Sequence, residues 1–173
     1  LESSHVRVMR VADNMRNVAV TEGDKVEAQI KFGWEVDAYP VNEIAESVDA
    51  VSAADVNTLV EEYYDKYEIL LEGRDPEEFR KHVAVQAQIE LGFERFLEEK
   101  NYQAIVTHFG DLGALKQLPG LAIQRLMQKG YGFGAEGDWK TAAMVRIMKI
   151  MTEGMKDAKG TSMLEDYTYN FVP

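Results

Sequence analysis

The segment Val6-Arg7-Val8-Met9-Arg10-Val11 alternates well enough to predict a β-strand, which the turn-forming pair Asp13-Asn14 then ends. A second strand is predicted over residues 34–39. A helix is expected between the two strands, running to about Phe32, where Gly33 supplies a left-handed stop. A strand, a helix and a strand in this order predict two parallel strands joined by a helical crossover.

Three helix starts carry capping signals. Thr21 with Asp24, and Ser52 with Asp55, have the spacing of a capping box, in which each side chain satisfies a free backbone donor. Asp75-Pro76-Glu77-Glu78 combines a cap, a proline at the first helical position and acidic groups near the positive end of the helix dipole. The three helices are expected to end near residues 32, 73 and 100.

The second half of the chain continues the alternation of strands and helices. Residues 102–109 predict a strand, residues 119–129 a helix, and residues 163–172 a final strand. A helix over residues 140–155 carries apolar side chains on one face, namely Met144, Ile147, Met148, Met151 and Met155. Because methionine fills irregular gaps, we expect this face to belong to the core. The pattern predicts an α/β fold with a parallel sheet flanked by helices.

Composition excludes several classes of protein. The chain has 173 residues, enough for one well-buried domain, and 30 acidic against 19 basic side chains give a net charge of −11. That charge repels phosphate backbones and anionic membrane surfaces, so we expect neither nucleic-acid nor membrane partners. The chain has no cysteine, which suits the cytoplasm and excludes disulfides and thiolate zinc sites. No apolar stretch approaches the roughly 18 residues of a membrane helix, and the first residues lack a signal-peptide layout.

Glycines are concentrated over residues 130–140, including the pattern Gly132-x-Gly134-x-x-Gly137. Such a density is tolerated where the main chain bends sharply or approaches a ligand. A dinucleotide fingerprint would need an apolar strand before the glycines and an acidic residue after the next strand. We expect a helix before the glycines, and Asp157 follows a helix, so nucleotide binding is disfavoured.

Two glutamates are candidates for chemistry. Glu136 lies in the glycine-rich loop just before a helix start, and Glu165 alternates with Tyr167 and Tyr169 on one side of the final predicted strand. Each has a structural alternative: Glu136 would complement a helix dipole, and Glu165 would lie on a solvated strand end. If both reach one pocket, they can share Mn²⁺ or Mg²⁺ and transfer a proton. His108, at a strand end, would either line a site or pack.

Three stretches closely resemble the L-arabinose isomerase family. They are DNMRNVAVTEGDKVEAQ over residues 13–29, GFGAEGDWK over residues 132–140 and EDYTY over residues 165–169. The resemblance implies that Glu136 and Glu165 bind Mn²⁺, with Mg²⁺ or Co²⁺ as substitutes, and do the acid/base work. It also implies that Met15, Phe109 and Tyr167 contact the sugar. Which glutamate is the base and which the acid is left open.

The resemblance further implies a Rossmann-like middle domain over residues 1–157, followed over residues 158–173 by the first strand of an incomplete C-terminal domain. Two histidines that complete the family's metal site lie beyond this chain, so we expect the chain alone to be inactive. The whole protein is expected to be a cytoplasmic homo-oligomer. It would isomerise L-arabinose to L-ribulose and D-galactose to D-tagatose through a cis-enediol. The alternative is a non-catalytic α/β module that binds a sugar or mediates oligomerisation.

Overall fold

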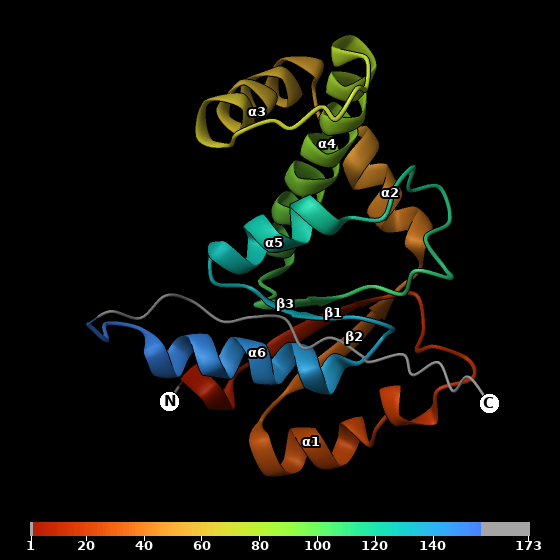
Figure 1. The fold of residues 1–173 in the computed structure, drawn as a ribbon. Helices are drawn as coiled ribbons and strands as arrows, with labels where there is room; N and C mark the ends of the chain where they lie inside the picture. Colours follow the sequence, from red (N-terminus) through yellow and green to blue (C-terminus); the bar gives the residue numbers. More distant parts are fainter. Residues whose placement is uncertain (1, 157–173) are drawn as a thin grey trace, which may run out of the picture.

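The computed structural model describes residues 2–156, and within them one parallel sheet lies between two layers of helices (Figure 1). The strands are β1 (Arg7–Val11), β2 (Glu35–Tyr39), β3 (Ala104–Val106) and β4 (Gly132–Gly134). The helices are α1 (Lys25–Phe32), α2 (Val41–Asp49), α3 (Ala53–Lys66), α4 (Pro76–Lys100), α5 (Gly120–Gln128) and α6 (Trp139–Thr152), with short 3-10 helices at Glu2–Ser4 and Ala19–Thr21.

The strand order β2-β1-β3-β4 confirms the predicted α/β class with a Rossmann-like parallel sheet. Helices α1 and α6 cover one face of the sheet, and α2, α4 and α5 cover the other, with α3 packed outside α4 (Figure 1). The crossover from β1 to β2 uses one face, whereas that from β3 to β4 uses the opposite face. The order therefore reverses between β1 and β3, where folds of this class bind ligands at the carboxyl ends of the strands.

Two of the three predicted caps are confirmed, and one is moved. The side chains of Ser52 and Asp75 accept hydrogen bonds from the backbone amides of Asp55 and Glu78, at 3.1 and 2.9 Å. For α1 the expected cap Thr21 is wrong, because its hydroxyl donates to the Val18 carbonyl and Asp24 caps the helix instead. Gly33 ends α1 with a φ of 73°, the left-handed conformation that its position predicts.

Other boundaries differ from those expected. Helix α3 ends at Lys66 instead of near residue 73, and β3 pairs over only three residues of the predicted strand 102–109. The glycine-rich loop contains a strand, β4, that its composition did not predict. Gly132 and Gly134, the first two glycines of the Gly-x-Gly-x-x-Gly pattern, lie inside that strand. Neither therefore forms the phosphate-binding turn of a dinucleotide fingerprint.

Gly132 and Gly134 allow α6 to approach the sheet. A Cβ atom on either residue would lie within 2.2 Å of a carbonyl oxygen of the α6 segment, that of Ala142 or Asp138. Their side of α6 buries Trp139, Ala142 and Ala143. At these two positions the glycines therefore serve helix packing and not a close ligand.

The methionine face of α6 is exposed, so its prediction as core is wrong. Met144, Met148, Met151 and Met155 are 46%, 47%, 71% and 59% exposed. The cause is the close approach of α6 to β4, since only the alanine side of the helix fits against the glycines. Ile147, between these two sides, is the one residue of the predicted set that packs against the core.

The predicted final strand over residues 163–172 and the predicted boundary near residue 157 lie outside the described residues. Within residues 2–156, no helix is long and apolar enough to cross a membrane.

Replacing Gly92 by alanine is expected to destabilise the fold, because Gly92 of α4 lies against α2. An added Cβ would lie 2.6 Å from the Cα of Val48. We expect the free energy of unfolding in urea to fall by about 1–3 kcal/mol, the usual cost of overpacking. Gly120→Ala is the matched control, since no atom lies within 4 Å of that Cβ. Equal effects of the two substitutions would contradict the assigned contact.

Candidate active site

Loops that follow three strands meet at the carboxyl edge of the sheet. The backbone amide of Met15, after β1, donates to the carbonyl oxygen of Glu136, after β4, at 2.8 Å. The amide of Gly137 donates to the carbonyl of Thr107, after β3, at 3.1 Å. The loop that contains Glu136, after the edge strand β4, therefore contacts the loops that follow β1 and β3. The order of the sheet reverses between these two strands.

The backbone of Glu136 is held in an unusual conformation. Its φ of 58° lies in the left-handed region that few non-glycine residues adopt. Gly137 follows with a φ of 80°, and a Cβ on it would lie 2.4 Å from the Cα of Asn14. Strain of this kind persists only where the surroundings enforce it, and it is concentrated at functional sites.

A cavity of about 220 Å³ opens beside Glu136. Glu136 is half-buried and borders the cavity. Phe109, after β3, is 56% exposed and also borders it. The remaining wall comes from strand ends and from α5 and the turn before it, namely Thr107, Leu118, Pro119, Gly120, Ile123, Gln124, Met127, Phe133 and Ala135. A mostly apolar wall with one carboxylate suits a small polar ligand that is oriented at one end.

The predicted site residues fall into three groups. Glu136 and Phe109 line the cavity together, and Met15 touches Glu136 through its backbone. Glu165 and Tyr167 lie outside the described residues. His108 does not border this cavity, and its Nδ1 atom accepts a hydrogen bond from the Gly110 amide at 3.1 Å.

Thr107 and the α5 residues of the wall, such as Ile123, were not predicted as site residues. Thr107 directly follows the last residue of β3, and Pro119-Gly120 begins α5, which contributes to the cavity wall. Both signals are present in the sequence, but only the strand order tells which loops are neighbours.

A metal ion would find one described ligand here. Among residues 2–156, no group of three or more acidic or histidine side chains is arranged to hold a metal. The chemistry of Glu136 fits a hard divalent cation, since carboxylate oxygens suit Mn²⁺ and Mg²⁺. The described residues thus fit as one part of a coordination shell and do not complete it.

A charged cluster lies beside the site on the α1 and α6 face. It consists of Arg10, Glu22, Trp139 and Lys140, and we name it the Glu22 cluster. The Glu22 carboxylate accepts from the Arg10 guanidinium at 2.8 Å and from the Trp139 indole N–H at 2.9 Å. Burial alone would raise the pKa of Glu22, but these hydrogen bonds and the Gly23 amide outweigh it and lower the pKa to about 2.

This lowered pKa predicts acid sensitivity. Because the unfolded chain binds the proton more readily, the stabilisation from Glu22 is present above pH 4.5 and is lost as pH falls towards 2. The side chain is 39% exposed, so solvent screening keeps the effect small. Urea unfolding between pH 5 and 2 should show a steeper loss for the wild type than for Glu22→Gln. Parallel pH profiles would contradict the role of Glu22.

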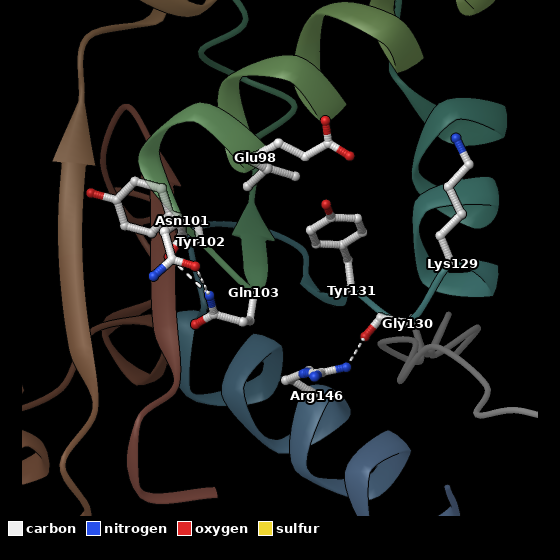
Figure 2. Close-up of a pocket in the computed structure, with 9 residues that line it drawn as sticks. Glu98, Asn101, Tyr102, Gln103, Lys129, Gly130, Tyr131 and Arg146 are labelled. Atoms are coloured by element: carbon white, nitrogen blue, oxygen red, sulfur yellow. Dashed lines mark hydrogen bonds between the residues drawn. The ribbon is translucent and has the colours of Figure 1, made fainter. Parts of the chain in front are cut away.

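A second cavity lies at the opposite edge of the sheet. It measures about 400 Å³ and is bounded by the segments that enter β3 and β4. Figure 2 shows Arg146 of α6 directed at the carbonyl of Gly130, a hydrogen bond of 2.8 Å, with Tyr131 and Glu98 on the facing wall. Of the predicted site residues that lie within residues 2–156, namely Met15, Phe109 and Glu136, none borders this cavity.

Comparison with known proteins identifies the family of the chain. Residues 7–154 match the family model described as the L-arabinose isomerase central domain. The chain is 54% identical to proteins named L-arabinose isomerase from Geobacillus thermodenitrificans and Anoxybacillus flavithermus, and 55% identical to one from Yersinia pseudotuberculosis. Each match covers 99% of this chain and 34% of the relative, so the chain spans about a third of their length. The chain therefore belongs to the L-arabinose isomerase family, whose central domain it contains.

Proposed function

We propose that the complete protein interconverts L-arabinose and L-ribulose, and also D-galactose and D-tagatose. The proposal is supported by family membership over nearly the whole chain and by identities of 54–55% to proteins named L-arabinose isomerase. The structural observation that carries it is the position of Glu136. This residue follows a strand at the carboxyl edge and borders a cavity large enough for a small sugar.

Glu136 and Glu165 transfer the proton in this proposal. One carboxylate removes the proton from C2 of the open-chain aldose. The electron pair of that bond forms the C1–C2 double bond while the carbonyl π pair moves to O1, which takes a proton from water. The resulting cis-enediol then gives its O2 proton to water as the C2–O2 carbonyl forms, and the other carboxyl group protonates C1, which gives the ketose. The proton on the first carboxyl group returns to the second through water. A Mn²⁺ ion held by Glu136, Glu165 and two histidines beyond the chain would stabilise the negative charge that develops on the sugar oxygens. Mg²⁺ or Co²⁺ would substitute for it.

Sugar contacts are assigned to Met15, Phe109 and Tyr167. The exposed ring of Phe109 borders the same cavity as Glu136, so it can pack against the C–H face of the sugar. The backbone of Met15 touches that of Glu136, which keeps its loop within reach of a ligand in the cavity. An apolar ring beside a single carboxylate orients a sugar without binding all of its hydroxyls.

The chain alone is proposed to be inactive, because its two glutamates leave the coordination shell incomplete. The complete protein is proposed to be a cytoplasmic homo-oligomer. The net charge of −11 on this chain repels nucleic acid and anionic membranes, which supports neither of them as a partner.

The test is an isomerase assay on the complete protein with L-arabinose and Mn²⁺ in D₂O. Formation of L-ribulose with deuterium at C1 supports the enediol route. Ribulose without solvent deuterium would favour a hydride shift instead. Binding of L-arabinose with no ribulose formed would overturn the isomerase proposal and favour a sugar-binding module.

A further inference from the structure

The loop after β1 contacts Glu136 at its backbone. The Met15 amide donates to the Glu136 carbonyl at 2.8 Å, and Gly137 lies so close to Asn14 that no Cβ would fit. Glu136 also has the left-handed φ of 58°. A displacement of this loop would therefore allow the strained residue to relax, and its carboxylate would move with it.

One guanidinium joins the two ends of the same loop. Arg10 of β1 binds Asp13 at the start of the loop at 2.9 Å and Glu22 near its end at 2.8 Å. The side chain of Arg10 is only 6% exposed. A buried charge that loses one of its two partners is costly, so both contacts are expected to persist in the folded protein.

The end of the loop is also fixed to α6. The indole N–H of Trp139 donates to Glu22, and the ammonium group of Lys140 donates to the carbonyls of Val20 and Glu22, both at 2.7 Å. Gly23 lies against the Trp139 ring, where a Cβ would be 2.9 Å from the Cζ2 atom. These contacts come from the two residues that begin α6, three and four positions after Glu136.

We propose that Glu22 is a positioning residue for Glu136: it closes the loop after β1 through Arg10 and Trp139, and the closed loop holds the Glu136 backbone in its strained conformation. The inference rests on the proposed acid/base function of Glu136. Glu22 itself does not border the cavity beside Glu136. Its effect on the reaction is therefore exerted through the loop.

The test uses the complete protein with Glu22→Gln, which removes the charge at nearly constant volume, and Trp139→Phe, which removes the indole donor and replaces a buried ring by a smaller one. The matched control is Glu27→Gln, because the Glu27 side chain forms an exposed ion pair with Lys31 within α1, and its backbone contact with Asp24 does not depend on the carboxylate. Two quantities are measured: the isomerase kinetics and the hydrogen exchange of the Met15 and Gly132 amides. Gly132 serves as the internal reference because its amide donates to the Gln103 carbonyl at 3.0 Å, at the end of β4 away from the loop.

We expect Glu22→Gln to lower kcat about ten- to hundredfold, with a smaller rise in KM, since small displacements of a reacting group have effects of this size. Exchange at Met15 should accelerate about tenfold or more relative to Gly132. Trp139→Phe should do the same, and the double variant should resemble the more severe single variant, because both act on one contact. Glu27→Gln should match the wild type in both measurements.

Three results would be decisive against the inference. Wild-type kinetics in Glu22→Gln would exclude a positioning role. Equal acceleration of exchange at Met15 and Gly132 would mean that the cluster merely stabilises the fold. Additive effects of the two substitutions would mean that they act separately. If the wild-type protein has no isomerase activity, the proposed function fails, and the exchange measurements still decide whether Glu22 holds the loop.

Discussion

In the complete protein, Glu136→Gln is expected to reduce kcat by about a hundred- to ten-thousandfold, the range assigned to loss of a general acid or base. The amide keeps the volume of the carboxylate but can neither take up a proton nor bind a divalent cation strongly. The fold should survive, because Glu136 is half-buried and its backbone contact with Met15 does not depend on the side chain. The measurement is the initial rate of L-ribulose formation at saturating Mn²⁺.

Glu27→Gln is again the appropriate control, since it makes the same chemical change on the exposed side of α1. Its rate should equal that of the wild type. A Glu136→Gln protein that retains more than a tenth of the wild-type rate would remove Glu136 from proton transfer.

The second large effect concerns stability: Glu90→Gln is expected to lower the free energy of unfolding by about 3 kcal/mol. Glu90 of α4 is completely buried and binds the Arg125 guanidinium of α5 at 2.8 and 3.0 Å and the Lys129 ammonium at 2.9 Å. Burial and the hydrogen bond to Glu90 raise the pKa of the Tyr63 hydroxyl, so this group of α3 remains a donor to the carboxylate.

The expected loss lies at the lower end of the range for a broken buried ion pair, because the two cations keep other partners. Arg125 still has Glu62 at 2.7 Å, and Lys129 still has Glu94 at 2.6 Å. The matched control is Glu61→Gln, which removes an ion pair with Arg80 from a side chain that is 70% exposed. That loss should not exceed about 1 kcal/mol in urea unfolding. A difference below about 0.5 kcal/mol between the variants would contradict a special role of the buried network.

The sequence predicted those elements whose signals are local. The cap at Asp75-Pro76 and the left-handed stop at Gly33 were sufficient to place α4 and the end of α1. Strand β4 was missed because two of its three residues are glycines, which have low strand propensity and pair only because β3 offers a neighbouring edge. The outward direction of the α6 methionines depends on the same contact and was therefore also missed.

Within the site, Glu136 could be selected from its place in a glycine-rich loop before a helix start, whereas Phe109 was selected only through the family resemblance. Their common cavity could not be predicted, because it depends on the order of strands that are distant in sequence. Arg10 offered a signal that was not used. A basic residue between the valines of a buried strand requires acidic partners, and these are Asp13 and Glu22.

The central claim is that Glu136 and Glu165 bind one divalent cation at the carboxyl edge of the sheet. The most direct measurement is to locate Mn²⁺ by its anomalous scattering in crystals of the complete protein. We expect a single anomalous-difference peak beside the cavity bordered by Phe109, within bonding distance of one carboxylate oxygen from each of the two glutamates. A manganese site elsewhere, or one that Glu136 does not reach, would contradict it.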